Sequence, residues 1–424
     1  MMKEKVCVIG LGYIGLPTAS IIANAGYEVV GVDINNSIVE KLNNGYVLIE
    51  EPNINEIVKK VVSEGKLRAM LTPETSDIFI ITVPTPITKD KKADMSYVIK
   101  AAESIVPLLQ KGNIVILEST SPVGTTKGLV TEILSESGLE IGKDIFLGYS
   151  PERVLPGNIV EELVNNNRII GGINAESTER IRAFYATFVK GELSLTDSTT
   201  AEMCKLVENT YRDVNIALAN ELAKICEDAG INVWEVIDLS NKHPRVNIHQ
   251  PGPGVGGHCI AVDPWFIVEK ASELTKLIKL SRDINDSMPN YMISRIKQIL
   301  INIRRRKKIT ILGITYKPNT SDIRNSPIIQ IVDILEKCDY DISIYDPYVE
   351  EFRYLEKDIV KACEESDLIL LGVNHKEFKY LDFNKLGKVM NNKNILDTRN
   401  YLSDNEELLG KFNYYLLGDG VLKA

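Results

Sequence analysis

The chain has 424 residues, 44% of them hydrophobic and 25% charged, which suffices for two or three domains with sizeable cores. Its net charge of −9 argues against a nucleic-acid partner, because binding a phosphate backbone requires many Lys and Arg side chains. The six cysteines lack metal-site or disulfide spacing and the four histidines are scattered, so we expect reduced thiols, a cytoplasmic location and no metal. No apolar run reaches the about 20 residues of a transmembrane helix, so no membrane is expected.

The first predicted elements form a dinucleotide-binding pattern. An apolar strand runs into Gly10-x-Gly12-x-x-Gly15, a helix follows, and a second apolar strand ends in Asp33. Such glycines allow a tight turn and close approach of a pyrophosphate, while the helix N-terminus offers free N–H groups. An acid at Asp33 would accept hydrogen bonds from ribose hydroxyls and repel a 2′-phosphate. The pattern therefore predicts NAD rather than NADP, against the alternative of an ordinary glycine-rich turn.

Further along, apolar segments at 78–83, 114–117 and 145–148 are typical of buried parallel strands. Ligands of open α/β sheets bind at the carboxyl ends of such strands. We therefore expect binding residues in the loops that follow them, at 82–86, 118–124 and 149–157.

The second half of the chain begins with long helical patterns, from Ser198 to about Gly230 and over roughly 264–303. The basic run 304–308 is interpreted as a solvated helix end. A second alternating block follows, with strands at 308–313, 341–346 and 367–373, but it lacks GxGxxG, which favours a different nucleotide. The predicted domains are 1–196, an NAD-binding Rossmann domain; 197–303, a helical central or dimerisation region; and 304–424, a Rossmann-like nucleotide-binding domain.

The glycine-rich segment 251–264 places four glycines before Cys259 and a carboxylate, Asp263, four residues after it. Glycines permit a shaped loop and close approach of a substrate, which is how a protein exposes a nucleophile. The alternative is a tight turn around a buried thiol. A thiol beside a nicotinamide site is useful for oxidising an aldehyde, because a thiohemiacetal can lose hydride and leave a thioester that water hydrolyses. The pair predicts oxidation of an alcohol to an acid.

Several separated motifs together resemble the UDP-glucose/GDP-mannose dehydrogenase family over nearly the whole length. They are Ser-Pro-Glu-Arg-Val-Leu-Pro-Gly at 150–157, Thr-Ala-Glu-Met-Cys-Lys-Leu-Val-Glu-Asn at 200–209, and the segment 243–266 around Cys259. The resemblance implies an α/β fold of two Rossmann-like domains with parallel sheets, joined by a helical central region. It also implies four-electron oxidation of a UDP-sugar at C6 by a homodimer or a dimer of dimers. Within the family, these segments are most similar to members acting on UDP-N-acetyl-D-mannosamine, which supply surface polysaccharide or glycan synthesis.

The same resemblance assigns roles to individual residues. Cys259 matches the nucleophile, Asp263 the acid that positions water, and Lys205 and Asn209 the donors that stabilise an oxyanion. Thr120 and Glu152 match loop residues that order water and take part in proton transfer. The implied cofactor-binding residues are Gly10, Gly12, Tyr13, Ile14, Gly15, Asp33, Thr82, Pro84, Thr85, Thr120 and Arg324. The implied substrate-binding residues are Glu152, Arg153, Val154, Lys205, Asn209, Arg212, His243, Arg245, Gly256, Tyr316 and Lys317.

Three positions need separate mention beside these matches. Many members carry lysine where this chain has Val262, so no chemistry is assigned there. His258 is adjacent to Cys259, but adjacency does not make a catalytic pair. Arg245 matches an arginine that reaches the neighbouring subunit's sugar site in the family, against the alternative of a surface ion pair.

Three alternatives stay open on the sequence. UDP-N-acetylglucosamine or UDP-glucose could be the substrate, because no residue can be shown to distinguish the sugars at C2. A two-electron dehydrogenase or epimerase would share the NAD pattern but would not need the cysteine loop. A non-catalytic sensor of NAD or nucleotide sugar would not need Cys259, Lys205 and Asp263 together.

Overall fold

The computed structural model describes residues 4–47, 49, 51–155 and 157–420. The chain forms two compact units. The first holds the described residues up to Glu208 together with the distant segment Trp265–Ser272, and the second holds Asn209–Pro264 and the described residues from Glu273 onward. The predicted domain boundaries at residues 196 and 303 stay a prediction.

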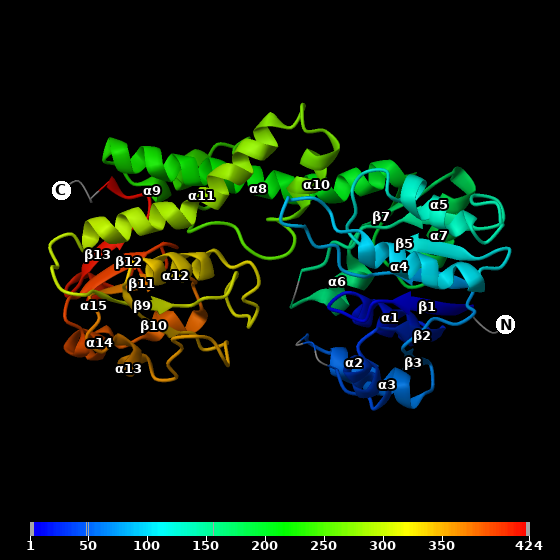
Figure 1. The fold of residues 1–424 in the computed structure, drawn as a ribbon, viewed down its shortest axis with the longest axis horizontal. Helices are drawn as coiled ribbons and strands as arrows, with labels where there is room; N and C mark the ends of the chain where they lie inside the picture. Colours follow the sequence, from blue (N-terminus) through cyan, green and yellow to red (C-terminus); the bar gives the residue numbers. More distant parts are fainter. Residues whose placement is uncertain (1–3, 48, 50, 156, 421–424) are drawn as a thin grey trace. The chain divides into compact units, whose positions relative to one another are not determined.

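The first unit is built on a sheet that, within the described part of the chain, has eight strands in the order β3-β2-β1-β4-β5-β6-β7-β8 (Figure 1). All neighbouring strands are parallel except β6 and β7, which pair antiparallel through Gly148 with Gly172 and Tyr149 with Gly171. The strands are β1 Lys5–Ile9, β2 Glu28–Val32, β3 Leu67–Met70, β4 Ile78–Ile81, β5 Ile114–Leu117, β6 Phe146–Tyr149, β7 Arg168–Gly172 and β8 Leu193–Asp197.

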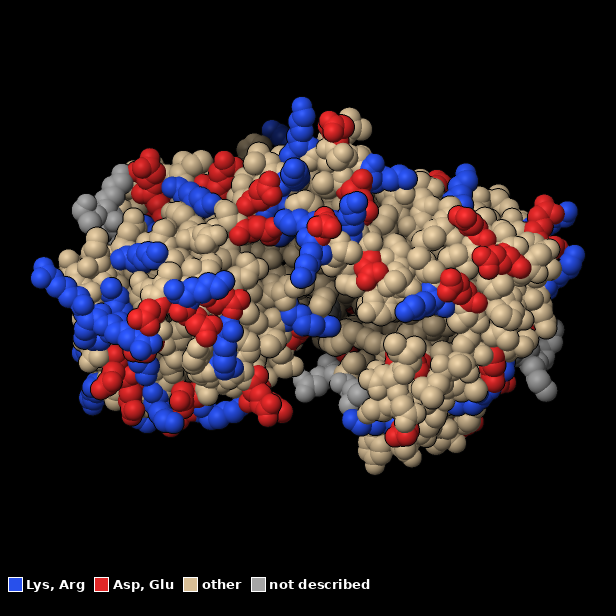
Figure 2. Space-filling view, viewed as in Figure 1, with Lys and Arg blue, Asp and Glu red and all other residues tan. Residues whose placement is uncertain are grey.

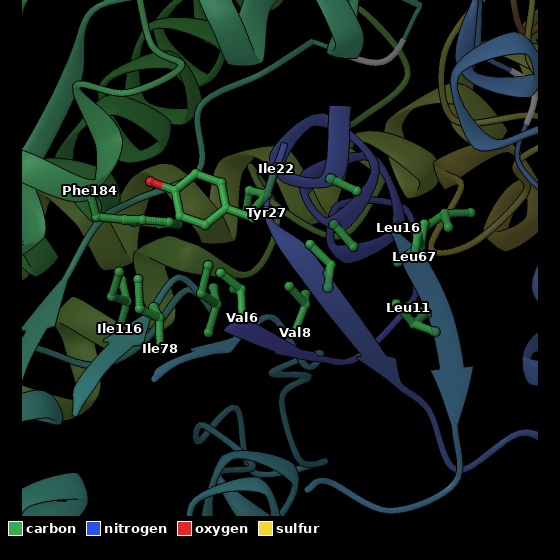
Figure 3. Packing of buried hydrophobic residues seen from close by; sticks show 14 of the residues in the cluster. Val6, Val8, Leu11, Leu16, Ile22, Tyr27, Leu67, Ile78, Ile116 and Phe184 are labelled. Atoms are coloured by element: carbon green, nitrogen blue, oxygen red, sulfur yellow. The ribbon is translucent and has the colours of Figure 1, made fainter. Parts of the chain in front are cut away.

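Helices cover both faces of this sheet, because each buried strand presents apolar side chains in both directions. On β1, Val6 and Val8 enter one cluster with α1, α3 and α7, and Figure 3 shows them beside Leu16 and Ile22 of α1. Cys7 and Ile9 enter the opposite cluster with α4 and α5. The helices are α1 Gly15–Asn24, α2 Asn36–Asn43, α3 Ile54–Ser63, α4 Ser96–Ile105, η1 Val106–Leu108, η2 Thr126–Val130, α5 Thr131–Ser135, α6 Ile159–Asn165 and α7 Ala175–Tyr185.

Four helices follow the first sheet: α8 Ser198–Ala229, α9 Val233–Asn241, α10 Asp263–Lys270 and α11 Lys276–Ile299. The 32-residue α8 begins at the predicted Ser198. The segment 265–272 within α10 and after it packs in the first unit, where Glu269 Oε2 accepts the N–H of Ala93 at 2.9 Å and the Lys91 ammonium lies 3.9 Å from the Trp265 ring centroid. No helix of the described residues is long and apolar enough to cross a membrane.

The second unit holds a smaller parallel sheet, five strands among the described residues, in the order β10-β9-β11-β12-β13. One face packs on α11 and α12, the other on α13, α14 and α15. Its elements are β9 Lys308–Leu312, α12 Pro327–Lys337, β10 Asp341–Tyr345, α13 Ile359–Cys363, β11 Leu368–Leu371, η3 Lys376–Tyr380, α14 Phe383–Val389, β12 Asn394–Asp397, α15 Glu406–Leu409 and β13 Asn413–Leu416. The predicted α/β class with two Rossmann-like sheets is confirmed, with the β6–β7 pair as the one antiparallel exception among the described strands.

Candidate functional site

The turn after β1 is tightly packed at Gly10 and Gly15 and open at Gly12. Gly10 has φ +95°, and a Cβ on Gly15 would lie 1.8 Å from the Gly10 carbonyl oxygen. Thr82, at the end of β4, donates its hydroxyl to the Gly10 carbonyl at 2.8 Å and so braces this turn. The space around Gly12 is open, since no atom lies within 4 Å of a Cβ there. This close turn at the start of α1, with one open glycine, fits a pyrophosphate.

Asp33 follows β2 and is oriented by the backbone. Its Oδ2 accepts the N–H of Leu11 at 2.9 Å and its Oδ1 that of Asn35 at 2.8 Å. The carboxylate stays half-buried, and the next side chain, Ile34, is 88% exposed. An oriented carboxylate beside an exposed apolar side chain suits a ribose and an adenine ring. Ile34 was not selected from the sequence, where an apolar residue after a strand looks like a continuation of it.

Other predicted cofactor residues lie around the same edge. Tyr13 donates its hydroxyl to Glu51 at 2.9 Å, and Ile14 precedes the first turn of α1. Thr85 donates its hydroxyl to the Thr120 carbonyl at 2.6 Å, which ties the loop after β4 to the loop after β5. The exposed Pro84 lies in the first of these loops.

Glu152 lies in the loop after β6, and its carboxylate is fixed at both oxygens. Oε1 accepts the N–H groups of Arg153 at 2.6 Å and Val154 at 2.9 Å, while Oε2 accepts from Arg168 at 3.1 Å. The ammonium of Lys205 on α8 donates to the Glu152 backbone carbonyl at 2.5 Å. The structure thus brings together Glu152 and Lys205, two residues to which the resemblance assigns separate roles, through the backbone carbonyl of Glu152.

In the second unit, Cys259 is an exposed thiol at the entry to α10. Its carbonyl accepts the N–H groups of Val262 at 3.0 Å and Asp263 at 2.9 Å, so the chain turns directly into the helix after the cysteine. A helix N-terminus favours negative charge and therefore a thiolate. The alternative of a buried thiol is wrong for Cys259, whereas Cys7, Cys226 and Cys363 are buried.

The glycines before Cys259 are explained by what they touch. Gly257 has φ +85°, and a Cβ there would lie 2.9 Å from the Tyr316 ring, while a Cβ on Gly256 would lie 2.6 Å from the Asn325 carbonyl. The Asn325 amide also donates to the Gly257 carbonyl at 3.3 Å. Bare backbone therefore holds the cysteine loop against the segment after β9. Burial, with the charge of Asp322, raises the pKa of Tyr316 to about 12, so this ring stays a phenol.

Three predicted residues form a hydrogen-bonded chain next to the cysteine loop, with Asn209 and Asp263 buried and Arg212 exposed. The Asn209 amide donates to the carboxylate of Asp263, and Arg212 donates to the amide oxygen of Asn209. Asn209 and Asp263 are both about 2% exposed. Asn209 lies one turn after Lys205 on α8, so the two predicted oxyanion donors share one helix face.

The remaining predicted cations differ in their surroundings. Arg324 donates through two nitrogens to Asp322, at 2.9 and 2.6 Å, so its charge is matched by a carboxylate of its own loop. Lys317 lies half-buried after β9, with its ammonium 5.9 Å from the Tyr316 ring centroid. Arg245 is exposed, as is His243, whose ring nitrogen lies 3.5 Å from the Arg245 guanidinium.

Two arginines near the predicted residues were not predicted from the sequence. Arg168 contacts Glu152 from the first position of β7. Arg399 follows β12, and a Cβ on Gly252 would lie 2.5 Å from its guanidinium. Burial lowers the pKa of Arg399 to about 10, which leaves it charged at neutral pH. Arg168 follows three asparagines and Arg399 follows a short strand, and neither lies in a recognisable motif, so only their three-dimensional neighbours reveal them. Val262, where many family members carry lysine, is buried.

The chain matches family models along most of its length. Residues 4–189 match the NAD binding domain of the UDP-glucose/GDP-mannose dehydrogenase family, 199–287 its central domain and 310–404 its UDP binding domain. The chain therefore belongs to the UDP-glucose/GDP-mannose dehydrogenase family, whose members are NAD-dependent dehydrogenases. The family resemblance predicted from the motifs is confirmed, and so is NAD as the cofactor.

Individual relatives agree over nearly the full length. The UDP-N-acetyl-D-mannosamine dehydrogenase of Methanocaldococcus jannaschii is 48% identical, over 98% of this chain and 97% of its own. The structure of UDP-D-ManNAc dehydrogenase from Pyrococcus horikoshii is similar at a TM-score of 0.93 with 41% identity, covering 98% of this chain and 99% of that one. A UDP-N-acetyl-mannosamine dehydrogenase structure from S. aureus has a TM-score of 0.91 and 49% identity, covering 98% of this chain and 99% of that one.

Proposed function

We propose that this enzyme oxidises UDP-N-acetyl-D-mannosamine at C6 to UDP-N-acetyl-D-mannosaminuronate, reducing two NAD per sugar. The names of the relatives support this substrate. The observation that carries the four-electron reaction is the exposed Cys259 at the entry to α10, four residues before the buried Asp263. An alcohol dehydrogenase that stops at the aldehyde has no use for such a thiol.

NAD, when bound, would supply the hydride acceptor for each of the two oxidations, and the residues of the chain would perform the remaining work. In the first oxidation the C6 hydroxyl loses its proton and C6 loses hydride, which gives an aldehyde. The Cys259 thiolate then adds to the aldehyde carbon and forms a thiohemiacetal. Loss of the second hydride leaves a thioester, and water hydrolyses it to the acid and the free thiol.

The roles of the neighbouring groups follow from charge. Lys205 and Asn209 are suited to stabilise the oxyanion that develops at C6, because both are donors held on one helix. Asp263, which is hydrogen-bonded to Asn209, would orient the hydrolytic water. Glu152 and Thr120 lie at the carboxyl edge of the first sheet, where water ordering and proton transfer are expected.

Each unit supplies proposed binding groups. The turn at Gly10 with Asp33 would hold NAD, with contributions from the loops after β4 and β5. The segment around Tyr316 and Lys317, within the match to a UDP binding domain, would hold the nucleotide part of the sugar. The reaction involves small molecules only, and we propose a cytoplasmic enzyme with no membrane or nucleic-acid partner. On the face shown in Figure 2, Lys and Arg are interspersed with Asp and Glu.

We further propose a homodimer, alone or paired into a dimer of dimers. Apolar side chains are exposed along α8 at intervals of four and seven residues, at Met203, Val207, Tyr211, Leu218 and Ile225. A stripe of this kind on one helix is typical of a helix-to-helix interface. The exposed Arg245 would then complete the sugar site of the neighbouring subunit.

Counting NADH tests the reaction. With limiting sugar, the final absorbance should give two NADH per UDP-N-acetylmannosamine, and a panel with UDP-N-acetylglucosamine and UDP-glucose ranks the substrates. One NADH per sugar would exclude the four-electron reaction. Binding without any NADH would favour the non-catalytic sensor.

Cys259→Ser should still bind NAD and sugar, because serine fills nearly the same space, while turnover collapses with the weaker nucleophile. Mass spectrometry of wild-type enzyme stopped during turnover should map an acyl or hemiacetal adduct to the Cys259 peptide. Wild-type rates in Cys259→Ala would exclude the covalent route.

Subunit mixing tests the shared site. Arg245→Ala and Cys259→Ala chains should each be inactive alone and should regain part of the activity when mixed dimers form. Mixed dimers that form and stay inactive would exclude the contribution of Arg245 across the interface.

A further inference from the structure

A buried cluster of charges lies directly beneath the loop after β6. The Arg168 guanidinium, with 6% of its side chain exposed, donates to Glu118 at 2.9 Å and to Glu152 at 3.1 Å. The same arginine donates to the Ser150 hydroxyl at 3.3 Å, and the Tyr185 hydroxyl donates to Glu118 at 2.5 Å. One cation therefore serves two carboxylates that come from the ends of two neighbouring strands, β5 and β6.

The two carboxylates have different surroundings. The Glu118 side chain is fully buried, and its Oε2 has no hydrogen-bond partner among the residues that the structure describes. Burial raises the pKa of Glu118 against the opposing charge of Arg168. Glu152 instead lies in the segment 150–157, whose family motif implies a part in the reaction. Its Oε1 accepts the backbone N–H groups of Arg153 and Val154. Arg168 supplies the second fixed point of Glu152, and Glu118 balances part of the charge of Arg168.

The geometry of the cluster explains why arginine is needed. Its planar fork reaches Glu118 and Ser150 through one nitrogen and Glu152 through the other. A lysine carries its three N–H donors on one freely rotating ammonium, so it cannot reproduce the planar fork that reaches these oxygens from two nitrogens. The guanidinium also lies 4.5 Å from the Tyr185 ring centroid, so α7 holds it against a flat surface. Burial alone would lower the pKa of Arg168, but the charges of Glu152 and Glu118 outweigh it and raise that pKa.

We infer that Arg168 is a positioning residue for the proposed proton transfer and water ordering by Glu152, and that Glu118 and Tyr185 hold Arg168 in place. Arg168 acts through Glu152 and does not itself contact the substrate. It fixes one carboxylate oxygen of Glu152, and it thereby keeps the backbone carbonyl of Glu152 in reach of Lys205. The Lys205 ammonium donates to the carbonyl of the same Glu152, so a shift of this residue would displace both groups. This inference rests on the proposed function, because it gives Glu152 a part in the reaction.

The test compares substitutions within the cluster. Arg168→Met should lower kcat by about 100-fold, the loss expected when a reacting group is displaced by about 1 Å. It should leave the KM for NAD unchanged. Arg168→Lys should fall between this variant and the wild type. Tyr185→Phe is the milder comparison, since it keeps the ring against Arg168 and removes only the hydroxyl that Glu118 accepts. It should lower the melting temperature, and it should lower kcat much less than Arg168→Met.

The pH profile separates position from stability. Losing the cation favours the protonated form of a neighbouring carboxylate, so the acid limb of kcat should move to higher pH in Arg168→Met. The groups that face this site are Glu118, Tyr185, Ser150, Lys205 and Arg153, and all remain in the variant. An unchanged acid limb with a reduced kcat would contradict the inference.

A double variant covers the case in which Arg168→Met does not fold. Arg168→Met with Glu118→Gln removes one buried charge of each sign, so the melting temperature should recover toward that of the wild type. We expect kcat to stay low. Recovery of kcat together with the melting temperature would assign Arg168 a purely structural role. A crystal structure of the double variant should show the Glu152 carboxylate turned from its present direction, and an unchanged carboxylate would overturn the inference even if every sugar tested proves inert. Failure of the proposed function is seen separately, as absence of NADH with wild-type enzyme.

Discussion

The two sheets of this enzyme begin in the same way and then diverge at one carboxylate. In each, the first strand ends at a glycine with positive φ, Gly10 at +95° and Gly313 at +81°. In each, an aspartate after the second strand accepts the N–H of the residue that follows this glycine. Asp33 accepts from Leu11 at 2.9 Å, and Asp346 accepts from Ile314 at 2.8 Å.

The difference lies in what else reaches the acid. Asp33 is half-buried beside the exposed Ile34, so its carboxylate remains available to a ligand. Asp346 is 4% exposed, and the fully buried His375 lies 3.2 Å from its Oδ2. Tyr348 stacks on His375 with 4.9 Å between ring centroids. The same turn thus leaves an acid open in one sheet, where we propose that it binds the ribose, and forms a structural hydrogen bond in the other, which fits the expectation of a single NAD.

The largest expected effect comes from closing the first turn. Gly15→Val would place Cβ 1.8 Å from the Gly10 carbonyl, so the backbone must shift. We expect a loss of about 3 kcal/mol in the free energy of unfolding and at least about 100-fold weaker NAD binding. Gly313→Val, whose Cβ would lie 2.7 Å from Val373, should cost stability alone. For both variants, calorimetry measures the affinity for NAD and urea unfolding measures the free energy of unfolding. An unchanged NAD affinity in Gly15→Val would contradict the assignment of this turn to NAD binding.

The second prediction concerns the closed acid. Asp346→Ala leaves the donors on Ile314, Tyr348 and His375 without their acceptor in a buried site. We expect a loss of about 3 kcal/mol in the free energy of unfolding and no change in the Kd of NAD. Urea unfolding gives the first quantity and titration of the folded variant the second. A weakened NAD affinity would show that the two sheets are not separable in this way.

The third prediction is the counterpart at the open acid. Asp33→Asn keeps an acceptor for the backbone but loses the charge, so NAD should bind about tenfold more weakly, with stability nearly unchanged. The discrimination against NADP should shrink, because the repulsion of a 2′-phosphate is removed. Parallel titrations with NAD and NADP measure both effects. A wild-type preference for NADP would reverse the role given to Asp33.

The smallest expected effect is the contribution of Asp346 to the loss of stability at acidic pH. Burial alone would raise the pKa of Asp346, but hydrogen bonds from His375 and Ile314 outweigh it and lower that pKa below 3.8. A depressed pKa in the folded state adds stability that is complete above the unfolded pKa and disappears as the pH falls through the folded value. Below about pH 4 the wild type should therefore lose stability more steeply than Asp346→Asn. Equal pH dependence of the free energy of unfolding in the two proteins would mean that the pKa of Asp346 does not differ between the folded and unfolded states.

Much of the fold was accessible from the sequence because its signals are local. The apolar run at 78–83 contains β4, and the helical pattern from Ser198 matches the first residue of α8. The antiparallel β7 was not foreseen, because a four-residue or five-residue apolar run carries no information about strand direction. Pairing through Gly148 and Gly171 depends on where the loop and α6 return the chain to the sheet.

The candidate site divides in the same way. Motif residues such as Gly15, Asp33 and Cys259 could be selected because their chemistry depends on neighbours in sequence. Arg168 could not, since its partners Glu118 and Glu152 lie 50 and 16 residues away and its own surroundings resemble any strand start. The half-buried Asp33 and the buried Asp346 also look alike in sequence, because each follows a hydrophobic residue at the end of a strand, Val32 or Tyr345.

The segment Trp265–Ser272 has a consequence for synthesis on the ribosome. It packs in the first unit, although the chain between Glu208 and Trp265 belongs to the second. A nascent chain that ends at Glu208 would lack the buried Trp265, Phe266 and Ile267 and the carboxylate of Glu269 that holds Ala93. At typical elongation rates, the missing piece arrives about 3 to 13 s later. The first unit therefore begins the chain but is complete only when Ser272 of the 424 residues has been made, and during that interval the apolar surface that Trp265, Phe266 and Ile267 cover stays open.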